Sequence, residues 1–325
     1  MPAPSEPTRL VTIFGGSGFV GRHIVRHFAK RGWRIRVAVR RPDLAGFLQP
    51  LGTVGQIRAV QANLRYPWSV EQALEGADAA VNCVGILVQS GNQSFDAIQA
   101  SGPRTISEAA KKAGIKDVVH ISAIGADAAS QIPYFRSKAE GEAGIFEHAP
   151  EAVVLRPSIV FGPEDDFFNR FAGMAGLSPV LPVIGGGTTR FQPVWVGDVA
   201  EAVARALEGK AQRGAVYELG GPEVLTFREC MELMLRTINR RRKIVSIPTG
   251  FAKAMSNFTK FLPNAPLTPD QVRQLELDNV VSDEAKAEGR TLDGLGIEPS
   301  ALELILPTYL VRFRSHGQFT ARYQG

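Results

Sequence analysis

The sequence predicts an α/β fold, a doubly wound parallel sheet with helices on both faces and a smaller C-terminal lobe. Short apolar runs alternate with amphipathic segments through the first half of the chain. A glycine-rich turn, GGSGFVG, joins the first apolar run to a helical pattern. Past residue 162 this alternation becomes irregular, and loops rich in glycine and proline separate the apolar segments. We therefore expect a core over 1–162 and an interleaved lobe with docking segments over 163–325.

Six apolar runs predict the strands of the parallel sheet. Each is short and bounded by charges or turn residues, which is typical of strands buried between helices. The runs lie at 9–15, 34–40, 56–62, 78–86, 117–124 and 151–160.

Helical spacing fills the intervals between these runs. Over 19–30 the apolar residues form one stripe, and Gly32 is placed to end the helix. A longer pattern over 94–115 contains Pro103, so this helix should start late or kink. Further helices are expected at 68–77, 134–149, 197–208 and 226–238.

The glycine-rich turn predicts a dinucleotide site of the Rossmann type. Gly15 would make the tight turn, Gly18 would let the backbone approach a pyrophosphate, and Gly21 would let the helix pack on the sheet. Ser17 and Phe19 lie between them, at a helix N-terminus that favours phosphate. The alternative is a glycine turn that holds no ligand.

The end of the second predicted strand indicates which dinucleotide binds. An NAD site usually has Asp or Glu there, for the ribose 2′-hydroxyl. This chain has Arg40 and Arg41, and Asp43 lies beyond Pro42. Guanidinium groups suit a 2′-phosphate, so we expect NADPH (NADP). The alternative is two solvated surface arginines.

Composition limits the other classes of function. A net charge of +5 is too small and too scattered to predict nucleic-acid binding. Cys83 and Cys230 give neither a disulfide framework nor metal-ligand spacing, and the five histidines are dispersed. The first ten residues have no apolar core typical of a signal peptide, and no apolar stretch reaches the roughly 18–20 residues that span a bilayer. We expect a soluble or peripheral protein without a metal.

With these motifs the chain resembles the extended or atypical short-chain dehydrogenase/reductase superfamily over nearly its whole length. The segment NLR (63–65) stands where that superfamily has an adenine-contacting Asp-Leu pair, and NCVGI (82–86) matches its ribose-contacting turn. YFRSK has the spacing of its catalytic Tyr and Lys. The cofactor-binding residues that we assign, from the glycine turn, the second strand and this resemblance, are Gly15, Ser17, Gly18, Phe19, Gly21, Arg40, Arg41, Asn63, Leu64, Val84, Gly85, Ser122, Tyr134 and Lys138.

Whether the chain turns the cofactor over stays open at this stage. Tyr134 and Lys138 are one helical turn apart, and a nearby ammonium would lower the pKa of the phenol for proton transfer. Ser122 is a candidate to polarise a carbonyl, but the superfamily's Ser or Thr aligns with Ile124. The interval from Ser122 to Tyr134 is also short. Tyr134, Lys138 and Ser122 are therefore only candidate catalytic residues.

Several segments of the sequence resemble one branch of the superfamily, the NADPH-binding accessory (39-kDa-type) subunits of respiratory complex I and their α-proteobacterial relatives. Among them are HISAIGAD, RPSIVFGPEDDFFNRF and FQPVWVGDVAEAV. The resemblance implies a tightly held NADPH that is not turned over. It also implies docking on the peripheral arm beside the quinone-site subunits, at the cytoplasmic side of a bacterial inner membrane.

The C-terminal third contains candidate docking segments. Residues 248–263 carry an apolar stripe at helical spacing, downstream of the basic run 239–243, which suits a membrane surface or a partner's groove. The alternative is packing on the chain's own lobe. Thr268 and Pro269 predict the start of a short helix over 268–279. The tail, 306–325, has no acidic residue and is expected to lie along an acidic partner or to fray.

The leading hypothesis is thus an NADP(H)-binding accessory subunit of complex I without catalysis of its own. The alternative is a soluble NADPH-dependent reductase or epimerase that uses Tyr134 and Lys138. A third hypothesis is a regulator that senses the redox state of NADPH.

Overall fold

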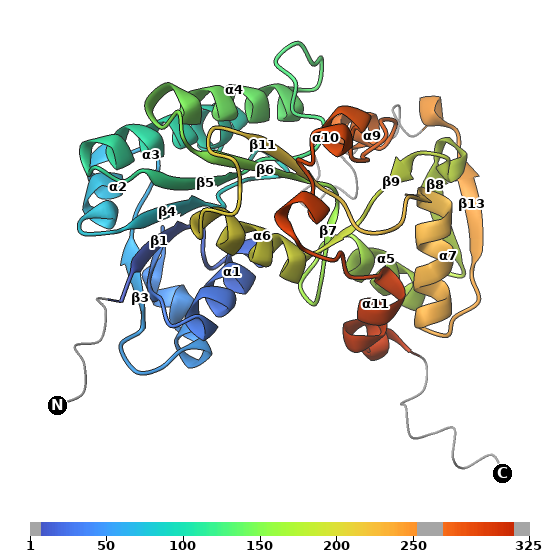
Figure 1. The fold of residues 1–325 in the computed structure, drawn as a ribbon. Helices are drawn as coiled ribbons and strands as arrows, with labels where there is room; N and C mark the ends of the chain where they lie inside the picture. Colours follow the sequence, from blue (N-terminus) through green and yellow to red (C-terminus); the bar gives the residue numbers. More distant parts are fainter. Residues whose placement is uncertain (1–7, 252–268, 315–325) are drawn as a thin grey trace. The chain divides into compact units, whose positions relative to one another are not determined.

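The computed structural model describes residues 8–251 and 269–314 (Figure 1). The chain forms two compact units, each assembled from three stretches of sequence. Unit 1 comprises 1–157, 196–219 and 283–297, and unit 2 comprises 158–195, 220–282 and 298–325.

Unit 1 is built on a seven-stranded parallel sheet in the order β11-β6-β5-β4-β1-β2-β3. This confirms the predicted parallel α/β fold. All five residues of β1 are buried, as expected for a strand with helices on both sides. The strands are β1 (Leu10–Phe14), β2 (Arg34–Val39), β3 (Ile57–Gln61), β4 (Ala79–Asn82), β5 (Asp117–Ile121), β6 (Val153–Pro157) and β11 (Val216–Leu219).

Helices cover both faces of this sheet. Figure 1 shows α2, α3 and α4 on one face and α1 and α6 on the other. The helices are α1 (Phe19–Lys30), α2 (Pro67–Leu74), α3 (Ser101–Lys112), α4 (Pro133–His148), α6 (Val196–Leu207) and α10 (Asp283–Ala287), with short turns η1 (Pro42–Leu51), η2 (Asp96–Ala100) and η4 (Asp293–Leu295).

Two of the predicted helix boundaries have visible local causes. Gly32, at φ 77°, ends α1, where its N–H donates to the carbonyl of Ala29 and the Trp33 N–H donates to that of Phe28. The predicted helix over 94–115 is irregular before Pro103: η2 is a π-helical turn that runs directly into α3 at Ser101, so Pro103 falls in the first turn of α3.

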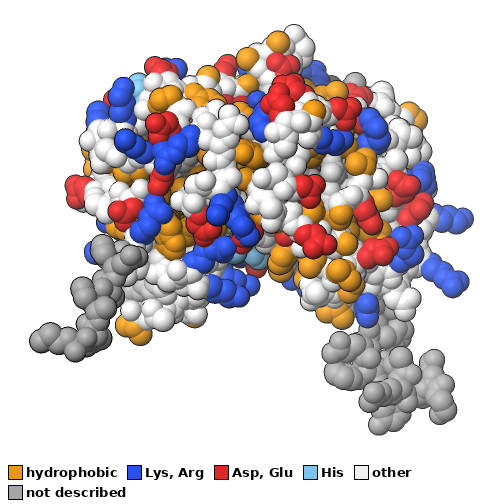
Figure 2. Space-filling view, viewed as in Figure 1, with side chains coloured by type: hydrophobic (Ala, Val, Ile, Leu, Met, Phe, Trp, Pro, Cys, Tyr) orange, Lys and Arg blue, Asp and Glu red, His pale blue; other side chains and the backbone are white. Residues whose placement is uncertain are grey.

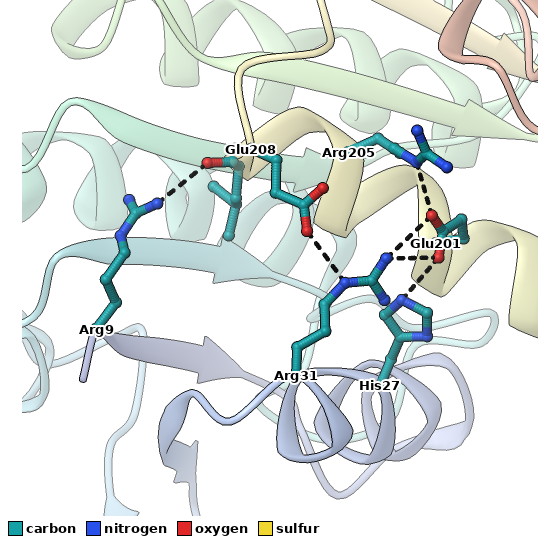
Figure 3. Close-up of polar contacts among 7 residues, drawn as sticks. Arg9, His27, Arg31, Glu201, Arg205 and Glu208 are labelled. Atoms are coloured by element: carbon teal, nitrogen blue, oxygen red, sulfur yellow. Dashed lines mark hydrogen bonds and ion pairs between the residues drawn. The ribbon is translucent and has the colours of Figure 1, made fainter. Parts of the chain in front are cut away.

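An ion-pair network joins α1 to α6 (Figure 3). The Glu201 carboxylate lies 2.9 Å from Arg31 Nη2 and 2.7 Å from Arg205 Nε. It also lies 2.9 Å from Nε2 of His27, and burial lowers the pKa of this imidazole. Arg31 also pairs with Glu208 at 3.0 Å. Because these side chains are only partly exposed, the network helps to hold α6 on the first Rossmann helix although 165 or more residues separate the two in sequence.

Unit 2 surrounds a cluster of phenylalanine rings. The ring of Phe167 lies 5.0 Å from that of Phe168 and 5.5 Å from that of Phe171, centroid to centroid. Its helix α7 begins at a capping box, in which Thr226 and Glu229 satisfy each other's backbone N–H. The helices in the described part of unit 2 are α5 (Phe168–Leu177), α7 (Phe227–Thr237), α9 (Pro269–Gln274) and α11 (Leu302–Leu310), with η3 (Gly185–Gly187) and η5 (Val311–Phe313).

Three two-stranded sheets lie in the described part of unit 2. The pairs β10–β7 and β13–β8 are parallel, and β12–β9 is antiparallel. The strands are β7 (Val160–Phe161), β8 (Val180–Ile184), β9 (Arg190–Phe191), β10 (Val194–Trp195), β12 (Leu225–Thr226) and β13 (Lys243–Ile247).

The expectation for the tail is wrong in its first half. Residues 306–313 lie in α11 and η5, and Leu306 and Leu310 are fully buried in the core of unit 2. They pack there because every third or fourth residue is apolar, a helical pattern that outweighs the scattered arginines. The rest of the tail, most of 248–263, and Thr268 lie outside the described residues. No described helix has the length and apolar character that crossing a membrane requires.

Candidate functional site

The site lies where the strand order of unit 1 reverses. The glycine-rich turn follows β1, and residues 83–86 follow β4, its parallel neighbour. Phe14 and Asn82, the last residues of these strands, are paired in register. In open α/β sheets a crevice forms beyond the strand ends at such a reversal. The sheet therefore brings the two turns together.

The three predicted glycines have different structural roles. Gly15 has φ 76°, and a Cβ there would lie 3.1 Å from Val84 Cγ2. A Cβ on Gly21 would lie 2.3 Å from the carbonyl oxygen of Gly15, so the helix is packed directly on the turn. Gly18 is exposed, and a Cβ there meets only that same oxygen, at 3.2 Å. The space beside Gly18 thus lies open at the helix N-terminus.

Arg22 stabilises this turn, although the sequence did not single out this residue. Its Nε donates to the Gly18 carbonyl (3.2 Å) and its Nη2 to the Ser17 carbonyl (3.1 Å). Its guanidinium lies 4.9 Å from the ring centroid of Phe47. The available signal was an arginine directly after Gly21. Phe19 is half-buried against His23, with their ring centroids 5.8 Å apart.

The structure separates the two arginines at the end of β2. Arg41 Nη2 pairs with Asp43 at 2.8 Å, and this hydrogen bond lowers the pKa of the Asp43 carboxyl. Arg40 is exposed and forms no ion pair with a described residue. Asp43 is therefore occupied by Arg41, whereas the guanidinium of Arg40 is available to a ligand.

The two residues predicted to contact adenine, Asn63 and Leu64, also differ in their surroundings. Leu64 is 7% exposed and belongs to the hydrophobic core of unit 1. Asn63 is half-buried, and its Oδ1 accepts a hydrogen bond from the backbone of Arg65 at 3.2 Å. Of the two side chains, only that of Asn63 has a polar group near the surface.

The turn after β4 is fixed by buried polar side chains that the sequence did not single out. Asn82 Oδ1 accepts from the Val84 N–H at 3.0 Å, and its Nδ2 lies 3.0 Å from His120 Nδ1. Burial lowers the pKa of His120 to about 3, so its imidazole is neutral. Gln99 Oε1 accepts from the Ile86 N–H at 2.8 Å, at the far end of the same turn. Gly85 is held between these two anchors and is exposed.

Lys138 reaches the end of β5 from α4. Its Nζ is buried and makes one long hydrogen bond, 3.4 Å, to the carbonyl of Ile121. The adjacent Ser122 Oγ is also buried and has no hydrogen-bond partner among the described residues. Two polar groups that are buried yet poorly paired suit a ligand that supplies the missing bonds. The ribose hydroxyls of a dinucleotide have the required chemistry, so these residues fit the group.

Tyr134 does not have the electrostatics expected of a catalytic phenol. Its ring packs edge-on against Phe95 and Phe135, at centroid distances of 5.8 and 5.5 Å. Lys138 Nζ lies 6.0 Å from the ring centroid, yet burial raises the pKa of Tyr134 to about 12. The expectation that the ammonium lowers this pKa is wrong, because desolvation of the phenolate dominates.

The lowered pKa of Lys138 predicts that the free energy of unfolding depends on pH. Burial lowers this pKa to about 8 from an ordinary 10.5, although Glu142 opposes the shift. Between pH 8 and 10.5 the unfolded chain holds a proton that the native chain has released, so stability should rise with pH by about 3 kcal/mol. We expect Lys138→Met to abolish this rise in urea-unfolding free energies measured from pH 7 to 10.5. Exposed Lys116→Met is the control, and an unchanged slope in Lys138→Met would contradict the assignment.

Comparison with known proteins identifies the family of the chain and several relatives. Residues 11–220 match the NAD dependent epimerase/dehydratase family, whose members bind a nicotinamide dinucleotide. The chain is 32% identical over 95% of its length to "NADH dehydrogenase [ubiquinone] 1 alpha subcomplex subunit 9, mitochondrial" of Arabidopsis thaliana, covering 79% of that protein. It is 28% identical to the "NADH-ubiquinone oxidoreductase 40 kDa subunit, mitochondrial" of Neurospora crassa, covering 95% of this chain and 80% of that one.

A shorter match is to an enzyme. "Ceramide reductase" of Caulobacter vibrioides is 32% identical over 59% of this chain and 58% of its own length. Among solved structures, DesIV (dTDP-glucose 4,6-dehydratase) from Streptomyces venezuelae with NAD and TYD bound superposes with a TM-score of 0.69 at 19% identity. That match covers 94% of this chain and 96% of the other, and shows the shared fold. The chain belongs to the NAD dependent epimerase/dehydratase family, and its homologues include accessory subunits of complex I.

Proposed function

We propose that the chain is a non-catalytic NADP(H)-binding accessory subunit of respiratory complex I, the NADH:quinone oxidoreductase. The observation that carries this proposal is the similarity along 95% of the chain, both units included, to two mitochondrial subunits of that enzyme. The protein would lie peripherally, at the cytoplasmic side of a bacterial inner membrane. Its partners would be the subunits of the peripheral arm around the quinone site.

The bound nucleotide would be NADPH. Arg40 offers an unpaired guanidinium at the end of β2, and the nearest carboxylate, Asp43, is occupied by Arg41. A 2′-phosphate is attracted by this arrangement, and a 2′-hydroxyl finds no carboxylate acceptor there. Gly15, Gly18 and Gly21, with Ser17 and Phe19, would receive the pyrophosphate at the start of α1.

The nucleotide would serve as a structural part. When bound, NADPH can supply a hydride, but hydride transfer to a carbonyl needs a proton donor beside it. Tyr134 is the candidate, and its pKa of about 12 makes the phenolate difficult to form. Lys138 and Ser122 would instead bind and orient the ribose. A ligand held only by the native state stabilises it by mass action.

A soluble NADPH-dependent reductase is the second candidate. Tyr134 and Lys138 lie on one face of α4, and one relative is a reductase. This candidate requires that Tyr134 exchange a proton with substrate.

Three variants separate the two functions. We expect Tyr134→Phe to retain NADPH and to assemble normally, because the phenol makes no hydrogen bond to a described residue. Gly18→Val should fold, since its Cβ meets only the Gly15 carbonyl oxygen, at 3.2 Å, and a shift of a few tenths of an ångström relieves this contact, but it should block the pyrophosphate. Arg40→Glu should bind NADPH about 10–100-fold more weakly, through loss of a charge-assisted bond, while NADH binding is little changed.

The measurements are NADPH content of the purified chain and its migration on native gels after mild-detergent extraction from the native host. Co-migration with NADH:quinone oxidoreductase subunits, lost in Gly18→Val and kept in Tyr134→Phe, is the expected result. Recovery of the wild-type chain only as a small soluble species, with NADPH oxidation abolished by Tyr134→Phe, would favour the reductase.

A further inference from the structure

A cleft in the described part of unit 2 is lined by arginines. It has a volume of about 630 Å³, and its wall is formed by one side of α7 from Arg228 onward, the loop after this helix and the start of β13. Figure 2 shows Lys and Arg side chains projecting at the right of the view, where Figure 1 places α7 and β13. The five arginines of this arginine cleft are Arg228, Arg236, Arg240, Arg241 and Arg242.

None of these five guanidinium groups forms an ion pair with a described residue. Backbone carbonyls hold three of them in place: Arg240 Nε donates to Phe313 and Arg242 Nε to Ala175, each at 2.8 Å, and Arg228 Nε donates to Gly186 at 3.4 Å. Arg242 Nη1 also donates to the carbonyl of Arg241, at 3.1 Å. Arg236 and Arg241 are exposed and make no side-chain hydrogen bond within the described residues. One carboxylate, that of Glu232, also lines the cleft. The cleft thus concentrates positive charge whose partners are not in the described chain.

Acidic residues gather at a second groove on α7. It is lined by Glu223, Glu229, Glu232 and Glu303 and also by Arg236, so that Glu232 and Arg236 border both hollows. Cations at a helix C-terminus are favoured by its dipole, which accounts for Arg236. It does not account for Arg241 and Arg242, which lie beyond the helix. From residue 233 to residue 251 the chain has five cations and no acid.

Large apolar side chains are exposed beside this charge. Leu177, two residues after the carbonyl that binds Arg242, is 94% exposed. Val180 and Val245, on the paired strands β8 and β13, are 41% and 46% exposed. A soluble phosphate makes no favourable contact with these apolar side chains. An anionic lipid surface binds the cations through its headgroups and buries the apolar residues in its interface.

We propose that the arginine cleft binds the phosphate headgroups of anionic phospholipids, with Leu177, Val180 and Val245 entering the lipid interface. Arg236 and Arg241 contact the phosphates, and Arg240 and Arg242, fixed through Nε, direct their remaining N–H groups to them. Lipid binding at this cleft requires neither the nucleotide nor other subunits. This proposal and the proposed function can therefore fail independently of each other.

The test is co-sedimentation of the purified full-length chain with vesicles of phosphatidylcholine alone or with phosphatidylglycerol added. We expect binding to the anionic vesicles that falls with salt. Arg236→Gln/Arg241→Gln should weaken it about 30-fold, which corresponds to about 1 kcal/mol for each cation near a charged surface. Arg34→Gln/Arg58→Gln, which removes two exposed cations of unit 1, is the matched control and should bind as wild type.

Leu177→Ser distinguishes a lipid surface from a soluble anion. It should weaken binding to the anionic vesicles several-fold and leave the fold unchanged, because this side chain is 94% exposed. Equal binding to both kinds of vesicle, or equal loss in the two double variants, would overturn the proposal. So would full displacement from vesicles by millimolar inorganic phosphate with no effect of Leu177→Ser, which would indicate a site for a soluble phosphate.

Discussion

Gly21→Ala is expected to destabilise the chain by about 3 kcal/mol and to release its nucleotide. The added methyl would lie 2.3 Å from the Gly15 carbonyl oxygen and 2.7 Å from the Gly16 Cα. Both are backbone atoms, so no side-chain rotation relieves the overlap, and α1 must move off the turn. Overpacking of this kind costs about 1–3 kcal/mol or more. Displacing α1 also moves its N–H groups away from the phosphates.

Thermal unfolding and nucleotide content of the purified variant measure the two effects. Gly46→Ala is the matched control, because a Cβ there meets nothing within 4 Å and the backbone φ is not positive. A Gly21→Ala chain with wild-type melting temperature and full nucleotide content would show that α1 does not pack on the turn as described.

The second large effect is expected from Glu142→Ala, which removes a buried ion pair. Glu142 accepts two hydrogen bonds from Arg156, at 2.8 and 2.6 Å, and so joins α4 to β6. The side chains are 7% and 23% exposed. Removing one partner of a buried pair costs about 3–5 kcal/mol. Arg156 keeps some access to water and lies 4.0 Å from Glu218, so we expect the lower end of that range.

Urea unfolding of Glu142→Ala, of Arg156→Met and of the double variant Glu142→Leu/Arg156→Met measures this cost. The double variant should be more stable than Glu142→Ala, because it leaves no unpaired buried charge. Glu142→Ala should also lower the pKa of Lys138 further, since Glu142 raises it. Equal stability of Glu142→Ala and wild type would mean that this pair is solvated.

The parts of the fold that follow from local pattern were predicted from the sequence. Apolar spacing and Gly32 define α1, and the alternation of runs and helices defines the parallel sheet. β11 was not predicted, because its four residues, VYEL, are too few and too polar to stand out. Its pairing with β6 depends on a partner more than 60 residues away in sequence.

The candidate site shows the same division between local and non-local causes. The glycine turn is a local motif and could be identified directly. The pKa of Tyr134 could not, because burial by Phe95 and other parts of unit 1 decides it, and the spacing of Tyr134 and Lys138 contains no information on burial. Likewise Arg40 and Arg41 are equivalent in the sequence, and only the folded backbone shows that Arg41 pairs with Asp43.

The three-stretch construction of unit 1 has a consequence for its synthesis. When residue 157 leaves the ribosome, β6 is complete but its outer edge has no strand beside it, and α1 has no α6 to cover it. Both partners are supplied by residues 196–219, which at about 5–20 residues per second emerge roughly 3–12 s later. During that interval the nascent chain exposes an open strand edge that can pair with another nascent chain. The interval ends when β11 pairs with β6 and α6 packs on α1.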